Sequence, residues 1–223
     1  YQPLPVKRVF IPKAGGGERP LGIPAVKDRI VQTALKMVIE PIFENEFVEH
    51  SYGFRPLRGC KLALRTVDGC LKAGQTWVVD ADMKSYFDTI PHALLMDEVE
   101  KFISDGKVLK LIQTYLEQDI LDGMNRWTPI AGTPQGAVIS PLLANLYLHS
   151  LDKLMMQSGY TMVRYADDFV ILCQSQEDAQ NALALAQQWV DDKGLTLHPD
   201  KTQVGNCLEV GQGFEFLGYR FEA

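Results

Sequence analysis

Cysteine is scarce in this sequence, and long apolar runs are missing. Among the 223 residues there are 4 cysteines, and none pairs with another in a C-x-x-C spacing. They are Cys60, Cys70, Cys173 and Cys207. Reduced thiols are therefore favoured over zinc ligands or a disulfide framework. No signal peptide and no apolar stretch of membrane-spanning length is recognisable. We therefore expect a soluble, cytoplasmic protein without a membrane partner.

An excess of positive charge is also missing. The formal net charge is -6, which by itself argues against nucleic-acid binding, because phosphate contacts need lysine and arginine. The distribution is uneven, however. Within residues 1–36 the basic side chains are Lys7, Arg8, Lys13, Arg19, Lys27, Arg29 and Lys36, and the acidic ones are Glu18 and Asp28. The N-terminal part can therefore contact phosphate, while carboxylates elsewhere account for the acidic total.

Two adjacent carboxylates separate two apolar, β-prone segments. Asp167 and Asp168 lie between Met162–Tyr165 and Phe169–Leu172, a pattern that predicts a strand, a tight turn and a returning strand. Adjacent like charges repel each other, so the pair is costly unless a cation binds there. A solvated Asp-Asp turn is the alternative, and it is the commoner one for an isolated pair.

A second group of carboxylates ends another strand. In Trp77–Asp82, side-chain alternation places Asp80 and Asp82 on one face, with Asp82 at the strand end. No histidine or cysteine lies nearby in the sequence, so oxygen-ligated Mg²⁺ is favoured over zinc. A pair of Mg²⁺ ions held by such carboxylates clamps the attacking and leaving oxygens of an in-line phosphoryl displacement. The two clusters together indicate polymerase or nuclease chemistry.

Sequence motifs along nearly the whole chain, from about Val9 to Phe221, follow the order typical of one polymerase family. They are Ile11–Lys13, Arg19–Pro24, Tyr52–Pro56, Asp82–Asp88, Gly132–Gly136, Ser140–Asn145, Tyr165–Asp168, Leu197–Thr202 and Phe216–Tyr219. Each block alone is weak or moderate support, whereas their shared order leaves little room for chance. The chain resembles the fingers and palm of reverse transcriptases of the bacterial group II intron type.

This resemblance implies an α+β fold with the right-hand architecture of polymerases. Residues 1–75 are expected to form the fingers, and residues 76–223 a palm of the split βαβ, ferredoxin-like kind. The order of a strand, helices, a strand-turn-strand unit, a helix and a further strand agrees with such a palm. The thumb is expected to be absent, so that the chain is expected to be a fragment of a longer protein.

The resemblance also implies roles for individual residues. Two Mg²⁺ ions, with Mn²⁺ as a substitute, are expected to bind Asp82, Asp167, Asp168 and the backbone carbonyl of Met83. Lys201 is the candidate general acid for the leaving pyrophosphate. The residues implied in nucleotide binding are Lys13, Arg19, Phe87, Gln135 and Gly136, and the exposed base facing the template is Arg55. Without the resemblance, the alternatives are a solvated turn around Lys13 and Arg19, a core position for Phe87, a structural Gln135 and a solvated Lys201.

The implied activity is that of an RNA-directed DNA polymerase, which adds dNTPs to a DNA or RNA primer on an RNA template. Intron RNA is a further possible partner. An RNA-templated RNA polymerase is one alternative, but the family places a bulky aromatic, here Phe87, where it would clash with a 2′-hydroxyl. A maturase-type RNA-binding scaffold with little catalysis is another alternative. Nucleotide cyclases also pair carboxylates with Mg²⁺, yet they lack the Pro134–Gly136 loop.

Local patterns predict the remaining elements. Helices are expected over about residues 25–47, 60–73, 92–117 and 140–157, and a capping box at Ser175 and Asp178 begins another that Gly194 ends. In the first helix, the apolar residues at helical spacing are Val26, Ile30, Val31, Ala34, Leu35 and Val38. An N-terminal hairpin with Gly15–Gly17 at its tip, a strand at Leu195–Leu197 and a hairpin at Phe214–Phe221 complete the prediction.

Overall fold

The computed structural model describes residues 1–12 and 16–222, which form two compact units. The first unit combines Tyr1–Glu46 with Phe87–Tyr147, and the second combines Phe47–Tyr86 with Leu148–Ala223. Helix α6 (Ser140–Gln157) contributes its N-terminal part to the first unit and its C-terminal part to the second. Within the described ranges, no helix is both long and apolar enough to span a membrane.

A four-stranded antiparallel sheet forms the centre of the second unit. Its strands are β3 (Trp77–Asp82), β6 (Thr161–Tyr165), β7 (Asp168–Cys173) and β8 (Gln203–Asn206), in the spatial order β6-β7-β3-β8. In sequence, helix α6 directly precedes β6, and helix α7 (Gln176–Asp192) connects β7 to β8. This order is that of a split βαβ, ferredoxin-like fold. The predicted α+β class and split βαβ topology are confirmed.

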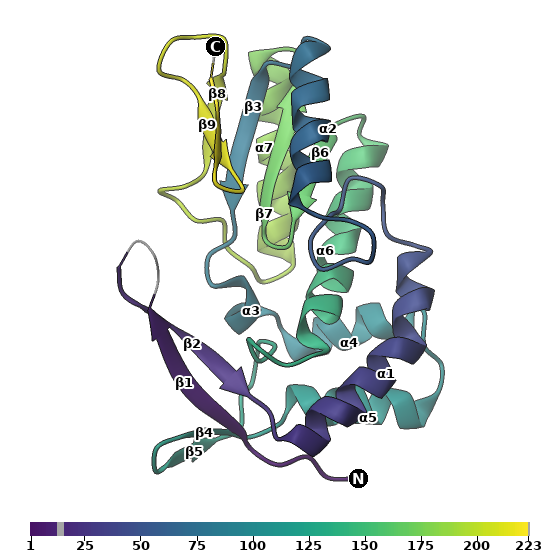
Figure 1. Cartoon of the computed structure of the whole chain (residues 1–223). Helices are drawn as coiled ribbons and strands as arrows, with labels where there is room; N and C mark the ends of the chain where they lie inside the picture. Colours follow the sequence, from purple (N-terminus) through teal and green to yellow (C-terminus); the bar gives the residue numbers. More distant parts are fainter. Residues whose placement is uncertain (13–15, 223) are drawn as a thin grey trace. The chain divides into compact units, whose positions relative to one another are not determined.

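Both faces of this sheet are covered (Figure 1). Helix α7 packs on β3, β7 and β8 and buries the small side chains Ala179, Ala182 and Ala186. The other cover consists of α2 (Cys60–Lys72) and the hairpin of β9 (Phe214–Phe216) and β10 (Tyr219–Phe221). Val78 belongs to this second core, so alternation along β3 directs Asp80 and Asp82 toward the side of the hairpin.

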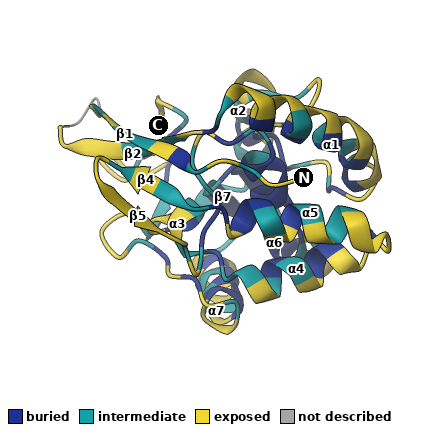
Figure 2. Cartoon of the chain, turned by 90° about the horizontal axis from the view of Figure 1, so that it is seen from below, coloured by how far each residue is buried: buried dark blue, intermediate teal, exposed yellow. Residues whose placement is uncertain are grey.

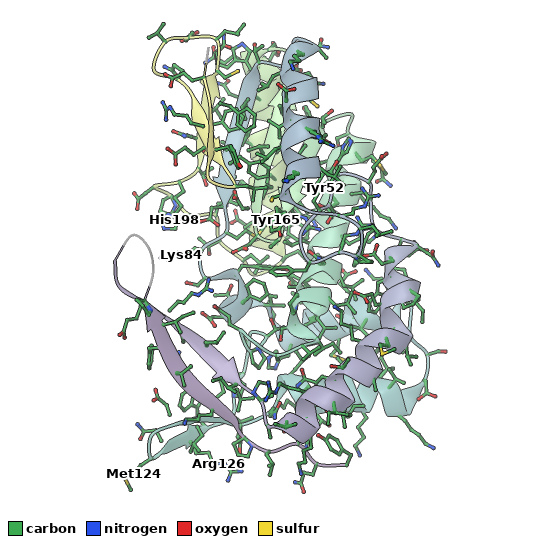
Figure 3. The ribbon with its side chains drawn as sticks, in the orientation of Figure 1. Tyr52, Lys84, Met124, Arg126, Tyr165 and His198 are labelled. Atoms are coloured by element: carbon green, nitrogen blue, oxygen red, sulfur yellow. The ribbon has the colours of Figure 1, made fainter. Side chains whose placement is uncertain are left out.

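A second four-stranded sheet belongs to the first unit. Strand β1 (Val6–Pro12) pairs antiparallel with β2 (Glu18–Ile23) and parallel with β4 (Ile120–Asp122), which pairs with β5 (Asn125–Trp127). The spatial order is β2-β1-β4-β5. The predicted N-terminal hairpin is therefore present, although its expected tip lies partly outside the described residues. The β4–β5 hairpin, where Figure 3 labels Met124 and Arg126, was not predicted because its strands are too short to show alternation.

The helices of the first unit are α1 (Val26–Glu44), α4 (His92–Glu100) and α5 (Gly106–Leu116), with the single turn α3 (Tyr86–Thr89) at the boundary between the units. The helical character expected over residues 92–117 is confirmed, although the chain forms two helices there with a short break between them. The carboxylate of Asp105 accepts hydrogen bonds from the backbone N–H groups of Lys107 (2.8 Å) and Val108 (3.0 Å). This side-chain cap starts α5 and separates it from α4.

Helix α1 buries a mixed face of polar and apolar side chains. The buried residues are Asp28, Gln32, Leu35, Ile39 and Phe43, whereas Val26, Ile30, Met37 and Val38 are exposed. Figure 2 shows the resulting alternation of buried and exposed positions along α1. The buried polar side chains form hydrogen bonds within this unit. Gln32 Oε1, for example, accepts from the Val138 N–H at 2.8 Å, whereas no partner of Gln32 Nε2 is found among the described residues.

Two local predictions for the C-terminal region have opposite outcomes. The Ser175 capping box is confirmed: the Asp178 N–H donates to Ser175 Oγ at 3.1 Å, and the Ser175 hydroxyl donates to the Asp178 carboxylate at 2.7 Å. The predicted strand at Leu195–Leu197 is wrong, because β8 begins only at Gln203. Leu197 instead forms an isolated bridge with Met83.

The two compact units do not coincide with residues 1–75 and 76–223. Phe87–Tyr147 groups with the N-terminal strands, and Phe47–Tyr86 groups with the C-terminal sheet. Compact units are defined by packing, whereas fingers and palm are functional divisions of a polymerase. The assignment of residues 1–75 to fingers and 76–223 to palm therefore stays a prediction.

Candidate active site

The carboxylates that were predicted to act together lie at neighbouring strand ends of the second unit. Asp82, the last residue of β3, is the register partner of Asp168, the first residue of β7. Asp167 precedes Asp168 in the turn from β6 to β7. Like charges directly opposite each other on antiparallel strands are destabilising. Because these opposed carboxylates destabilise the fold, their presence indicates a functional role, such as binding a cation.

A cleft of about 550 Å³ opens beside these strand ends. Its charged and amide side chains come from the sheet, from the segment before β8 and from the β9–β10 hairpin. They are Asp80, Asp82, Asp168, Asp200, Lys201, Gln203, Glu215 and Arg220. A cleft with this composition suits a ligand that combines cations with phosphate better than it suits an apolar ligand.

Burial and mutual repulsion favour the protonated form of these carboxyl groups. Burial, assisted by the charges of Asp82, Asp80 and Asp167, raises the pKa of Asp168 to about 7. Burial also raises the pKa of Asp167 and of Asp80, and the charge of Asp82 adds to both shifts. A nearby cation would favour the ionised forms instead, because opposite charges lower a carboxyl pKa.

Lys201 supplies a positive charge to the cluster. Its ammonium group forms an ion pair with the Asp82 carboxylate, and this hydrogen bond raises the pKa of Lys201. Beside it, the Gln203 side-chain amide donates to the Asp80 carboxylate at 3.2 Å. The structure thus places Lys201 against one of the candidate catalytic carboxylates, while its role as a general acid stays a prediction.

The chemistry of this donor set fits magnesium. Carboxylate oxygens are preferred ligands of hard divalent cations. Burial and the neighbouring carboxylates raise the pKa of Asp167 and Asp168, and a bound cation would offset both effects. Among residues 1–12 and 16–222, no group of three or more His, Cys, Asp or Glu side chains is already arranged to hold a metal ion. Asp82 is paired with Lys201 instead. A metal ion bound there would compete with the Lys201 ammonium group for the Asp82 carboxylate.

In the first unit, two of the predicted nucleotide-binding residues line one cavity. Phe87 and Gln135 lie on a cavity of about 280 Å³, together with Arg8, Asp88 and Trp127. The Gln135 amide donates to the Asp88 carboxylate at 3.4 Å, and the Arg8 guanidinium stands 5.4 Å from the centre of a Trp127 ring. Burial raises the pKa of Asp88. The structure brings Phe87 and Gln135 together, whereas their contact with a nucleotide stays a prediction.

The loop that carries Gln135 packs directly on β2. Gly136 has a φ of +102°, and a Cβ there would lie 2.5 Å from the Gly22 carbonyl oxygen. The Gly22 N–H donates to the Gln135 carbonyl at 2.6 Å. Only glycine therefore permits this contact at position 136. Arg19 is exposed in β2, and Lys13 lies outside the described residues.

Arg55 is buried, and its predicted exposure is therefore wrong. The residue is 7% exposed, its Nη1 donates to the carbonyl oxygens of Val48 and Ser51 at 2.7 Å each, and its guanidinium stands 5.1 Å from the centre of the Phe47 ring. The loop before α2 folds around the Arg55 side chain, and carbonyl oxygens of the same loop accept its hydrogen bonds. A template-facing role for Arg55 stays a prediction, and these contacts oppose it.

The structure adds residues around the candidate site to which the sequence had assigned no role. Asp80 shares the cleft with Asp82, as the alternation along β3 predicted, although no role was assigned to Asp80. Arg164 and Asp152 form a buried ion pair next to the Tyr165–Asp168 turn. No local pattern could reveal it, because the partners come from β6 and α6. Met83 is buried, and metal ligation by its backbone carbonyl stays a prediction.

Comparison with known proteins adds independent findings. Residues 11–221 match the reverse transcriptase (RNA-dependent DNA polymerase) family. Protein YkfC of Escherichia coli (strain K12) is 38% identical over 260 aligned residues, which cover 99% of this chain and 67% of YkfC. The group II intron-encoded protein LtrA of Lactococcus lactis subsp. cremoris is 41% identical over 158 residues, which cover 70% of this chain and 26% of LtrA.

Solved structures agree at the level of the fold. Apo telomerase from Candida Tropicalis matches with a TM-score of 0.76 over 98% of this chain and 47% of the telomerase chain, at 14% sequence identity. The chain spans about a quarter of the length of LtrA. The family match over nearly all residues and the similarity to YkfC and LtrA confirm the predicted resemblance. The chain belongs to the reverse transcriptase (RNA-dependent DNA polymerase) family.

Proposed function

We propose that this chain catalyses RNA-directed DNA synthesis by adding deoxynucleotides to a primer 3′ end. The observation that carries the proposal is the cross-strand pair of Asp82 and Asp168, with Asp167 in the adjoining turn, beside an acidic cleft. Membership of the reverse transcriptase family supports RNA as the template. Within this proposal, residues 1–75 act as fingers and residues 76–223 as palm.

The proposed cofactor is a pair of Mg²⁺ ions, for which Mn²⁺ can substitute. Their proposed ligands are Asp82, Asp167, Asp168 and the backbone carbonyl of Met83. When bound, such ions neutralise the charge that develops on the attacking and leaving oxygens of phosphoryl transfer. The cluster of buried carboxylates supports this assignment: burial and the charges of neighbouring aspartates raise the pKa of Asp168, and a bound cation would stabilise its ionised form.

The remaining residues would bind and orient the substrate. Arg19 offers a planar fork and Lys13 a point charge for the triphosphate. Phe87 would lie beneath the sugar and exclude a 2′-hydroxyl, with Gln135 and Gly136 beside it. Lys201 would release Asp82 and hold a proton near the leaving pyrophosphate.

The proposed partners are an RNA template, a DNA or RNA primer and a dNTP. Intron RNA is proposed as a further partner, because the relative LtrA is a group II intron-encoded protein. The basic side chains within residues 1–36 support contacts with these polyanions.

Primer extension on defined templates tests the proposal. We expect the purified chain to extend a DNA primer on an RNA template with dNTPs and Mg²⁺, and Asp82→Asn to lose this activity. Asp192→Asn, at the exposed C-terminal end of α7, is the matched control and should extend like the wild type. Equal use of rNTPs would favour an RNA-templated RNA polymerase instead. RNA binding without extension by the wild type would favour a maturase-type scaffold.

A further inference from the structure

Arg164 is a fully buried charge directly before Tyr165–Asp168, the catalytic turn of the proposed function. It lies in β6 and has 0% exposed surface. Its Nε and Nη2 donate to the two carboxylate oxygens of Asp152 at 2.7 and 2.5 Å. Asp152 comes from α6 and is itself buried. A bidentate pair of this kind fixes the plane of the guanidinium as well as its position.

The fixed guanidinium reaches the turn itself. Its Nη1 donates to the carbonyl oxygen of Ala166 at 2.8 Å. Ala166 has a φ of +59°, in the left-handed region that disfavours residues with a Cβ. Strained backbone of this kind persists only where its surroundings hold it. The Ala166 carbonyl belongs to the same planar peptide unit as the Asp167 N–H, so the bond to Arg164 fixes the plane from which Asp167 continues.

The segment before α2 closes on the same turn. Ser51 Oγ accepts from Arg164 Nη2 at 2.9 Å, and the Tyr52 N–H donates to the Arg164 carbonyl at 2.8 Å. A Cβ on Gly53 would lie 2.3 Å from the Ala166 nitrogen, so glycine is needed for this approach. Figure 3 labels Tyr52 and Tyr165, which come from these two segments. The motif that the resemblance linked to the template therefore contacts the catalytic turn.

Stability alone is a poor explanation for this ion pair. Apolar replacements of buried ion pairs are often neutral or stabilising, because desolvation offsets the attraction between the charges. A bidentate guanidinium does provide direction, which an apolar side chain cannot. We propose that Arg164, oriented by Asp152 and Ser51, is a positioning residue that fixes the Ala166–Asp167 peptide and so directs the Asp167 carboxylate. This inference rests on the proposed function.

Steady-state kinetics of Arg164→Lys test the inference. Lysine keeps the charge but cannot bind Asp152 in two places and reach the Ala166 carbonyl as well. We expect kcat for primer extension, per folded molecule, to fall at least about 30-fold while KM for dNTP changes less than about threefold. Glu98→Gln is the matched control: it is a buried carboxylate paired with Lys101 at 2.5 Å and lies outside this network. It should keep kcat within about twofold. Equal losses in both variants would overturn the proposal.

Two further variants approach the turn from the other side and leave the Asp152 pair intact. Gly53→Ala should displace Ala166 and lower kcat at least about 30-fold, and Ser51→Ala should lower it about three- to tenfold, again without a matching rise in KM. If Arg164→Lys does not fold, the kcat values of Gly53→Ala and Ser51→Ala test the positioning role of Arg164. Wild-type kcat in folded Gly53→Ala would overturn the proposal.

A readout without catalysis separates this inference from the proposed function. In protein labelled with 3-fluorotyrosine, the Tyr165 signal in the ¹⁹F NMR spectrum is identified by its loss in Tyr165→Phe. Arg164→Lys should shift or broaden this signal, and Glu98→Gln should leave it in place. If the wild type fails to extend primers, the proposed function is wrong, and the Tyr165 signal still decides the positioning role. An unchanged signal in Arg164→Lys would overturn it.

Discussion

The Asp168 carboxyl has a pKa of about 7, raised first by burial and then by the charges of Asp82, Asp80 and Asp167. An unperturbed aspartate has a pKa of about 3.9. Between these values the folded protein binds more protons than the unfolded chain, so the free energy of unfolding falls as the pH rises. The loss should be complete above a pH of about 7. In metal-free solution, therefore, this group makes the protein less stable at neutral than at mildly acidic pH.

Asp168→Asn should remove that part of the pH dependence, because asparagine does not titrate. Urea denaturation in the presence of a chelator, repeated between about pH 4 and pH 8, measures the difference between the two proteins. We expect the variant to gain stability relative to the wild type as the pH rises. Asp200 is an exposed carboxylate in the same cleft, and Asp200→Asn is the control. This variant should retain the wild-type dependence of stability on pH. Parallel curves for Asp168→Asn and the wild type would contradict the raised pKa.

Phe87 offers a second prediction for a single residue. It lines a cavity with Gln135, and the proposal places its ring beneath the sugar of the nucleotide. Phe87→Val should therefore lower the ratio of kcat/KM for dNTP over rNTP at least about tenfold, while dNTP use falls only moderately. Both values are measured on one primer-template. An unchanged ratio would identify Phe87 as a packing residue and place the sugar discrimination elsewhere.

The residues of the candidate site differ in how far the sequence could reveal them. Asp167 and Asp168 are adjacent in the chain, and Asp82 ends a strand with clear alternation, so a local pattern contained each cluster. Ser51 and Arg164, in contrast, are 113 positions apart. Arg55 was expected on the surface because loop arginines usually are exposed. It instead donates to the carbonyl oxygens of Val48 and Ser51 in its own irregular loop, whose shape no periodic pattern predicts.

At the scale of secondary-structure elements, the sequence predicted those with strong local signals. The Ser175 cap, the β6–β7 hairpin and helix α6 follow from capping residues and apolar periodicity. The sequence did not predict the β4–β5 hairpin or the start of β8, because alternation of apolar and polar side chains is hard to recognise in strands of 3 or 4 residues. Helix α1 was recognised as a helix, but its buried face includes Asp28 and Gln32, whose partners are distant in sequence.

Substitutions on the two faces of α1 test that description. Leu35 is 7% exposed and Val38 is 66% exposed, although both fit the helical apolar pattern. Leu35→Ala should lower the free energy of unfolding by about 2–5 kcal/mol, through lost burial and the cavity left behind. Val38→Ala should change it by less than about 0.5 kcal/mol. Equal effects of the two substitutions in urea denaturation would show that the buried face is misassigned.

The α7 cap gives a further prediction at this scale. Ser175→Ala removes the oxygen that accepts from the Asp178 N–H and should cost about 1 kcal/mol of stability. Denaturant unfolding measures this loss. Ser158→Ala, at an exposed serine just beyond α6, is the control and should change stability by less than about 0.5 kcal/mol. A neutral Ser175→Ala would mean that water replaces the cap at no cost.

At the scale of the whole chain, the net charge of -6 limits binding to nucleic acid. Most candidate phosphate contacts lie within residues 1–36. We expect fewer than about four such contacts and therefore a slope of log K against log salt shallower than about −3.6 on a duplex. Fluorescence anisotropy with an RNA–DNA hybrid at several salt concentrations measures this slope.

Arg19→Gln sharpens the salt measurement. If the exposed Arg19 contacts one phosphate, the substitution should make the slope shallower by about 0.9. Arg126→Gln is the control: this exposed arginine is hydrogen-bonded to Asp119 at 2.6 Å and should leave the slope unchanged. A wild-type slope near −8 would reveal a basic surface much larger than the one inferred from the sequence.

The most direct test of the central claim is the rate of a single dNTP incorporation under single-turnover conditions. Asp167→Asn keeps the size of the side chain but removes the charge that the proposal assigns to cation binding. We predict that the rate falls at least about 10³-fold relative to the wild type, while the melting temperature and the affinity for the RNA–DNA hybrid stay close to wild-type values. Incorporation by folded Asp167→Asn at the wild-type rate would contradict the assignment of these carboxylates as the catalytic centre.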